Sequence, residues 1–234
     1  GKTGQLLAII EANYLGQLRT GAASGVATEV MARPDAKIVG LLGTGLQART
    51  QLKAVCTVRR IERVEVYGRD PERRERFAAE MSEYCGTQVV PVHAPDEAAD
   101  EKDIVICATT SRVPLFDGRG IDEGTHLNVV GSNWPSKAEI DQTTVRRADV
   151  IVCDSIEACQ KEAGDFNAAI EEGAFEWSKA RELSAVLTGN ETGRATPEDI
   201  TLFKSVGLAV ADVAMAARIL QRDREEELGI ELPF

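Results

Sequence analysis

The sequence predicts an α/β protein, in which a doubly wound parallel sheet is joined to a second, mainly helical domain. From residue 37 onward, short apolar runs alternate with helical patterns. The apolar runs are continuous, as in parallel strands that are covered on both faces. Both ends of the chain are mainly helical. We therefore expect residues 34–154 to form the sheet domain, and residues 1–33 and 155–234 to come together as the second domain.

The elements expected in the sheet domain follow one another in a regular order. A buried strand at 37–42 leads into a helix at 46–58, and a strand at 63–67 leads into a helix at 71–84 whose first turn holds a proline. Further strands are expected at 88–92, 103–108, 126–130 and 150–153. Strands that alternate with helices indicate βαβ units, which place the strands in one parallel sheet.

The flanking segments carry longer helical patterns. Residues 13–33 are predicted as one helix, 181–187 as a short helix, and 207–228 as a long helix rich in alanine. Residues 196–199 (TPED) have the chemistry of a helix N-cap. Because these segments hold few large side chains, we expect the second domain to need more chain, or a partner subunit, to close its core.

The charge balance argues against several classes of partner. The chain has 38 acidic and 27 basic residues and a net charge of -11, which repels nucleic acid and anionic lipid. No apolar run approaches the roughly 18 residues of a membrane span, and no signal peptide is recognisable. The five cysteines are scattered and only two histidines are present. Neither a metal site nor a disulfide framework is therefore expected, and the cytoplasm is the default location.

The strongest chemical motif is GTGLQA at residues 43–48, which follows the first expected strand and opens a helix. Gly43 permits a tight turn, Gly45 lets the backbone approach a pyrophosphate, and Ala48 lets the helix pack closely on the strand. The helix N-terminus offers free N–H groups to the phosphates. This context predicts dinucleotide binding; the alternative is a merely tight turn between strand and helix.

The end of the second strand indicates which dinucleotide is bound. NAD enzymes commonly place a carboxylate there, where it binds the ribose 2′-hydroxyl. This chain has Gly68 at that position, followed by Arg69 and Asp70. A missing carboxylate beside an arginine favours the 2′-phosphate of NADP(H) over NAD(H), and Arg73 and Arg74 are candidates to assist. In the alternative, Asp70 binds the ribose and Arg69 is solvated.

Small polar residues follow the next two strands. Thr109 and Thr110 come after the strand expected at 103–108, and Val130 begins the segment VGSN that ends at Asn133. Ligands of open α/β sheets lie at the carboxyl ends of the strands, so these residues are candidates to line the cofactor. The alternative is an ordinary polar loop.

Arg19 is an unusual residue for its position. On the first helix it shares one face with Leu15, Ala22, Val26 and Val30, so we expect its guanidinium to be buried and to need an anionic partner. A structural carboxylate, a substrate carboxylate and a cofactor phosphate are the three alternatives.

Asp212 poses the same question in the second domain. It lies in the Ala-rich stretch GLAVADVAM at 207–215, where a carboxylate is either paired or functional.

Together the motifs resemble one known family along nearly the whole chain. They are LRTGAA at 18–23, GTGLQAR at 43–49, GTHLN at 124–128, EID at 139–141 and ITLFKSVG at 200–207. They resemble the ornithine cyclodeaminase/mu-crystallin family. The resemblance implies a Rossmann-type NAD(P)-binding domain, a dimerisation and substrate domain, a homodimer, and hydride transfer between a nicotinamide and the carbon that bears nitrogen in a small amino or imino acid.

The resemblance also implies roles for individual residues. Arg19 and Thr20 match a pair beside cofactor phosphate and substrate, and Arg19 would clamp the substrate carboxylate. The remaining cofactor-binding residues that it implies are Gly43, Gly45, Leu46, Gln47 and Ala48 in the phosphate loop, Gly68, Arg69 and Asp70 after the second strand, Thr109 and Thr110 near the adenosine ribose, and Val130 and Ser205 near the nicotinamide.

Two departures from the family pattern bear on the reaction. Cyclodeaminases have an aspartate where this chain has Asn133, and an amide cannot take a proton as a carboxylate does. The family also has an N-terminal portion with a lysine and an arginine for the substrate site, so the second domain is expected to be incomplete in a chain that opens at Gly1.

The departure at Asn133 favours an NAD(P)H-dependent reductase of imino acids of the ketimine or pyrroline-2-carboxylate type, with Asn133 orienting the substrate nitrogen. The alternatives are a lyase that converts ornithine to proline and ammonia with retained NAD, an alanine dehydrogenase, and a non-catalytic NADPH-dependent carrier of a small ligand.

Overall fold

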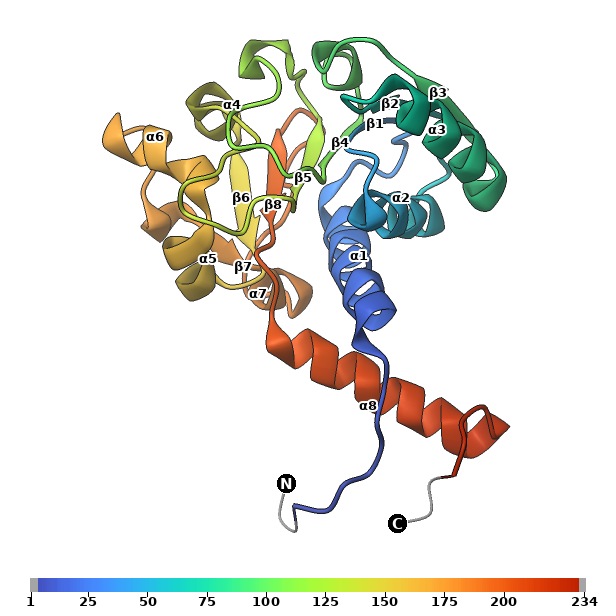
Figure 1. The fold of residues 1–234 in the computed structure, drawn as a ribbon. Coiled ribbons are helices and arrows are strands. Elements are labelled where there is room, and N and C mark those ends of the chain that lie inside the picture. The colour runs from blue at the N-terminus through green and yellow to red at the C-terminus, as the bar shows by residue number, and fades with distance from the viewer. Residues whose placement is uncertain (1–3, 232–234) are drawn as a thin grey trace.

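The computed structural model describes residues 4–231, and in them one eight-stranded parallel sheet is flanked by helices (Figure 1). The strand order is β3-β2-β1-β4-β5-β8-β6-β7, and every neighbouring pair is parallel. The strands are β1 (Ile38–Leu42), β2 (Arg63–Tyr67), β3 (Gln88–Pro91), β4 (Ile104–Cys107), β5 (His126–Val129), β6 (Val150–Cys153), β7 (Arg181–Glu182) and β8 (Thr201–Lys204). The predicted α/β class with a parallel sheet is confirmed.

The first half of the chain folds much as its sequence predicts. Its helices are α1 (Ala12–Met31), α2 (Leu46–Val58) and α3 (Pro71–Cys85), with a short 3-10 turn at Asp96–Ala98. Asp70 caps α3 by accepting a hydrogen bond from the Arg73 N–H, and Gly86 ends it with a left-handed φ of 65°. Local capping chemistry therefore fixes both ends of this helix.

The second half holds shorter helices around β6 and one long helix at its end. The α-helices are α4 (Gln142–Arg147), α5 (Ile156–Glu162), α6 (Asn167–Glu171), α7 (Leu183–Leu187) and α8 (Ala209–Glu226), and the 3-10 turns are Gly118–Gly120, Gly164–Phe166 and Trp177–Lys179. Phe166, Phe175 and Trp177 stack together in the core of this half, with ring centroids about 5 Å apart.

The end of the chain differs from the prediction. Residues 201–204 form β8, which is fully buried between β5 and β6, and β7 also joins the sheet. The cap chemistry at 196–199 closes a turn, in which Asp199 accepts hydrogen bonds from the N–H groups of Ala195 and Thr196. Part of the segment 155–234, expected outside the sheet, therefore lies in it. The division of the chain into two domains stays a prediction, and residues 1–3 and 232–234 lie outside the described residues.

The apolar face expected on α1 is only partly buried: Leu15 is buried as predicted, but the prediction was wrong for the other apolar residues of this face. Val26 and Val30 are 36% and 37% exposed, and Ala22 is exposed as well. Instead α1 packs on α2 through small residues. At Gly21 the two helices are so close that an added Cβ would lie 2.5 Å from the backbone oxygen of Thr50. Close contact of backbones, and not a stripe of large side chains, holds this helix.

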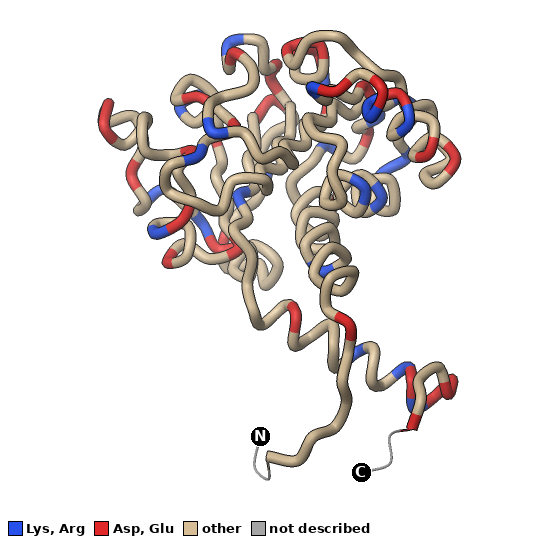
Figure 2. Tube along the Cα trace, viewed as in Figure 1, with Lys and Arg blue, Asp and Glu red and all other residues tan. Residues whose placement is uncertain are grey.

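The helix α8 extends away from the sheet, and the extended segment that precedes α1 crosses it (Figure 1). It packs against α1, and none of its residues is buried. Charged residues are scattered over the rest of the molecule, whereas the segment before α1 is almost free of them (Figure 2). Within residues 4–231, no helix has the length and apolarity needed to cross a membrane.

Candidate functional site

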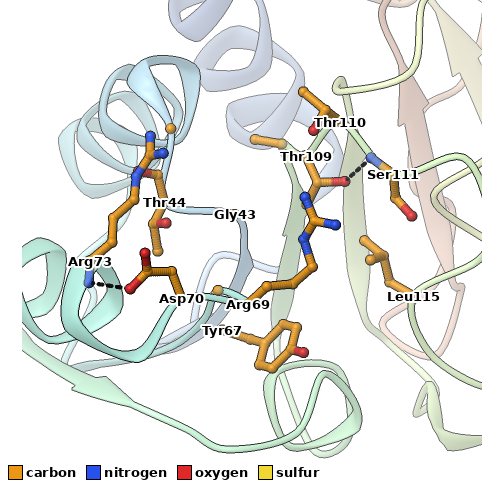
Figure 3. Close-up of a pocket in the computed structure, with 13 residues that line it drawn as sticks. Gly43, Thr44, Tyr67, Arg69, Asp70, Arg73, Thr109, Thr110, Ser111 and Leu115 are labelled. Atoms are coloured by element: carbon orange, nitrogen blue, oxygen red, sulfur yellow. Dashed lines mark hydrogen bonds between the residues drawn. The ribbon is translucent and has the colours of Figure 1, made fainter.

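A cleft of about 620 Å³ opens at the carboxyl ends of β1, β2 and β4 (Figure 3). A second hollow of about 370 Å³ adjoins it and extends to α1, β5 and the segment after β8. The two share Gly45, Ala108, Thr109 and Thr110. They form one groove along the edge of the sheet where ligands of open α/β sheets bind.

The phosphate loop lies at the centre of this groove. Gly43 has a φ of 119°, and a Cβ there would lie 2.3 Å from the backbone oxygen of Ala108. Gly45 caps α2 without any side-chain hydrogen bond, and a Cβ built on it would meet nothing within 4 Å. The first N–H groups of α2 thus have no capping side chain, and the residues that carry them line the groove, as a pyrophosphate site requires. Ala48 is fully buried behind the loop.

Three polar side chains surround the turn after β2. Asp70 turns toward Thr44 and accepts a 3.1 Å hydrogen bond from the Arg73 N–H (Figure 3). The Nε of Arg73 donates to the backbone oxygen of Thr44 over 3.1 Å. Arg69 points across the cleft toward Thr109 and Ser111 (Figure 3). Two cations and one carboxylate therefore line this end of the groove.

Gly68 and Arg74 support that turn from behind. A Cβ at Gly68 would lie 2.7 Å from the Cγ2 of Thr44, so no larger residue fits the observed packing. Arg74, which was expected to assist in binding phosphate, is only 5% exposed and donates from Nη1 to the backbone oxygen of Gly68 over 3.0 Å. It holds the turn and does not face the cleft.

The anionic partner that the Arg19 guanidinium was expected to need is the carboxylate of Asp212. The Nε of Arg19 lies 3.0 Å from Oδ1 of Asp212, and the two side chains are 21% and 39% exposed. The sequence singled out both residues separately, and the fold joins them across α1 and α8. The terminal nitrogens of Arg19 have no hydrogen-bond partner in the described part of the chain and lie against Gly207, where an added Cβ would be 3.0 Å from Nη1.

Asp154 holds the turn at 205–207, a role that the sequence did not reveal. Its Oδ2 accepts hydrogen bonds from the Ser205 hydroxyl over 2.7 Å, from the Val206 N–H over 3.1 Å and from the Gly207 N–H over 2.8 Å. Asp154 lies 51 residues from Ser205 along the chain. No local pattern announces such a contact.

Buried carboxylates also support the segments after β4 and β5. Glu139 accepts hydrogen bonds from the N–H groups of Thr109, Gly131 and Ser132 and from the Thr109 hydroxyl. Burial, together with the nearby Asp165, raises the pKa of Glu139 above its usual range. The sequence placed Glu139 in a family motif but gave it no role.

The predicted site residues are brought together at this groove, with the exception of Ala48. Arg19, Thr20, Leu46, Gln47, Val130, Asn133 and Ser205 line the end near α1, and Gly43, Gly68, Arg69 and Asp70 line the end near β2, with Gly45, Thr109 and Thr110 between them. That these residues bind a cofactor or substrate stays a prediction.

The known proteins to which this chain is similar include enzymes that reduce imino acids. A Δ1-pyrroline-2-carboxylate reductase of Bacillus cereus is 38% identical over 234 residues, which cover 100% of this chain and 72% of that protein. The solved Thermococcus litoralis Δ1-pyrroline-2-carboxylate reductase in complex with NADH and L-proline is similar over 99% of this chain and 72% of its own, with a TM-score of 0.94 and 42% identity.

A further solved structure has the same fold. An archaeal alanine dehydrogenase dimer with bound NAD matches 100% of this chain and 72% of its own, with a TM-score of 0.91 and 32% identity. The model of the ornithine cyclodeaminase/mu-crystallin family matches residues 1–227. The resemblance seen in the motifs is thus confirmed over almost the whole chain. This chain belongs to the ornithine cyclodeaminase/mu-crystallin family.

Proposed function

We propose that this chain is an NAD(P)H-dependent reductase of small cyclic imino acids of the Δ1-pyrroline-2-carboxylate type. The observation that carries the proposal is the continuous groove, which has a phosphate loop at its centre and the guanidinium of Arg19 at one end. The relatives that bear the name of this reductase support the substrate class. Hydride transfer to the carbon of a C=N bond fits a site that positions two ligands side by side.

The residues present fit a nicotinamide dinucleotide. The N–H groups at the start of α2 would hold the pyrophosphate, and the turn after β2 would hold the adenosine ribose. Val130 and Ser205 lie at the other end, where the nicotinamide ring would rest. When bound, this cofactor supplies the hydride, and the chain contributes alignment and the exclusion of water.

Arg19 would bind the substrate carboxylate. The N–H groups of Gly131, Ser132, Val206 and Gly207 already donate to Glu139 and Asp154. Those backbone donors are not free to hold an anion, so the free nitrogens of Arg19 are the strong donors at this end. A guanidinium can bind both oxygens of a carboxylate at once.

Asn133 would orient the imine nitrogen. It is exposed at the edge of the groove, and an amide both donates and accepts hydrogen bonds. It cannot store a proton as a carboxylate can, which favours reduction of an imine over a lyase cycle that takes a proton from an amine.

We further propose that NADP(H) is preferred over NAD(H). Arg69 and Arg73 flank the turn after β2, where a 2′-phosphate would lie, and no carboxylate ends the strand itself. Asp70 supports the opposite preference, although its Oδ1 accepts the N–H that caps α3. The solved relatives contain NADH or NAD, so direct comparison of the two cofactors is needed.

A homodimer in the cytoplasm is the proposed setting. The helix α8 exposes Val210 and Val213, each 67% exposed, and apolar side chains of this kind are commonly covered by a partner subunit. The five cysteines are all free thiols, as in a reducing compartment.

The deciding experiment supplies the purified protein with NADPH or NADH and Δ1-pyrroline-2-carboxylate, and follows the absorbance of the reduced cofactor. Steady oxidation with formation of proline is the expected result. Release of ammonia from ornithine without net oxidation would instead identify a lyase. Tight cofactor binding with neither reaction would leave a carrier.

A further inference from the structure

We propose that Glu139 is a positioning residue that fixes the middle of the cofactor groove by tying the loop after β4 to the loop after β5. The inference uses the proposed cofactor site as its readout and assigns no contact between Glu139 and a ligand. Glu139 is fully buried and is not among the residues that line the groove.

One carboxylate gathers four donors from the two loops. The Oε1 atom accepts from the N–H and from the hydroxyl of Thr109, each over 2.7 Å. The Oε2 atom accepts from the N–H of Gly131 over 2.7 Å and from the N–H of Ser132 over 3.1 Å. Each oxygen therefore serves a different loop, and the side chain bridges them.

The two loops touch closely at this point. A Cβ added at Gly131 would lie 2.3 Å from the backbone oxygen of Thr109 and 2.4 Å from Oε1 of Glu139. The backbone of Glu139 adds a third attachment, because its carbonyl accepts from the N–H of Leu115, which lines the groove, over 2.9 Å. The groove is thus held from behind at three places by one residue.

A buried ion pair holds Glu139 itself in place. Oδ1 of Asp165 accepts from the Glu139 N–H over 2.6 Å. Nζ of Lys204 donates to Oδ2 of Asp165 over 2.7 Å and to the backbone oxygen of Ser132 over 2.6 Å. Neither side chain of this ion pair is exposed. The oxygens of Glu139 and Asp165 and the ammonium of Lys204 all have hydrogen-bond partners, which makes the network rigid.

The four donors require the ionised form of Glu139. A protonated carboxyl would point its own hydrogen at one of the donors and lose an acceptor. Burial raises the pKa of Glu139, while Lys204 and the Thr109 donors lower it. Because Glu139 is buried and does not line the groove, it acts through the loops and not on the ligand.

The test compares two substitutions from the same EID motif. Glu139→Gln keeps the shape of the side chain but sets an amide NH₂ against donors. Asp141→Asn is the matched control, since Asp141 also accepts three hydrogen bonds, from the Gly118 N–H and from the N–H and hydroxyl of Thr144, at a place away from the groove. Cofactor dissociation constants are measured by fluorescence titration with NADPH and with NADH, at a temperature where circular dichroism shows each variant to be folded.

We expect Glu139→Gln to raise the dissociation constant for both cofactors by about tenfold or more, because buried donors that face a charged acceptor lose their partner. The KM for the cofactor should rise with it, and kcat at saturation should change less. Asp141→Asn should lower the melting temperature and leave the cofactor affinity unchanged. If folded Glu139→Gln binds cofactor as the wild type does, the proposal is overturned.

Hydrogen exchange of the unmodified protein tests the same idea without a variant that must fold. The amides of Thr109, Gly131 and Ser132 should be strongly protected from exchange although they lie in loops. Rapid exchange at all three would refute the proposal that Glu139 ties the two loops together. A wild-type protein that shows this protection but binds neither NADPH nor NADH would contradict the proposed function and not the link that Glu139 makes between the loops.

Discussion

The two ends of the groove are built in different ways. At the phosphate loop and the turn after β2, the structure depends on neighbours in sequence: Gly43 bends the chain, Gly45 opens a helix, and Asp70 caps the next one. At the end near α1, a distant carboxylate holds the backbone, as Asp154 does 51 residues from Ser205. The first end depends on backbone conformation, and the second on long-range charge.

The first prediction concerns the phosphate loop, where the largest effect on cofactor affinity is expected. Gly43→Ala should weaken cofactor binding by about a hundredfold, because a side chain at this positive φ is strained and collides with a backbone oxygen. The added Cβ would lie 2.3 Å from the oxygen of Ala108. Isothermal titration calorimetry with NADPH measures the change.

Gly86→Ala is the control for that substitution. Gly86 also has a positive φ, of 65°, but a Cβ there meets nothing within 4 Å. This variant should lose about 1 kcal/mol of stability and keep its cofactor affinity. Wild-type affinity in Gly43→Ala would contradict the assignment of the phosphate loop.

The end of the groove near α1 is tested by Arg19→Ala. We expect kcat/KM for the imino acid to fall by about a hundredfold, mainly through KM, since a bidentate ion pair with the substrate carboxylate is lost. Steady-state kinetics at saturating cofactor provide the measurement. Arg33→Ala, which breaks the ion pair with Asp103 at the other end of α1, should leave this KM unchanged. A similar KM in both variants would exclude Arg19 from the substrate site.

Arg69→Ala sharpens the comparison within the first end. If Arg69 binds a 2′-phosphate, the variant should bind NADPH about tenfold more weakly and NADH as before. Arg60→Ala, at an exposed arginine just beyond α2 that does not line the groove, is the control. Equal losses for both cofactors, or none, would reject the proposed preference.

The last prediction concerns the stability of the fold and not the groove, through His126 at the start of β5. Burial lowers the pKa of His126 to about 3, with Arg194 contributing, so the folded protein keeps this ring neutral where the unfolded chain binds a proton. The stability from this group is present above pH 6.5 and is lost as the pH falls from 6.5 toward 3, by about 1.4 kcal/mol per pH unit. Urea unfolding of wild type and His126→Gln across this range should give a flatter pH dependence for the variant. Parallel curves would show that His126 is not the group that titrates.

What the sequence predicted follows the same division. The strands and helices up to residue 92, and the phosphate loop, were predictable because turn glycines, caps and apolar runs act over a few residues. The pairing of Arg19 with Asp212 was beyond reach, although both residues were noticed, since 193 positions separate them.

The errors have physical causes as well. The strand β8 was not predicted because it ends in Lys204, and a lysine usually indicates an exposed position. Here its charge is buried and paired with Asp165. The buried face of α1 was missed because Gly21 and Gly25 pack by close backbone approach, which leaves no periodic pattern of large apolar residues.

The ion pair between Arg19 and Asp212 joins the groove to α8, a helix that has no buried residue. If a partner subunit that covers α8 displaces Asp212, the arginine at the groove loses its carboxylate partner, and a ligand that draws Arg19 away from Asp212 would act on α8 in return. By thermodynamic reciprocity, assembly and substrate affinity would then change by the same factor.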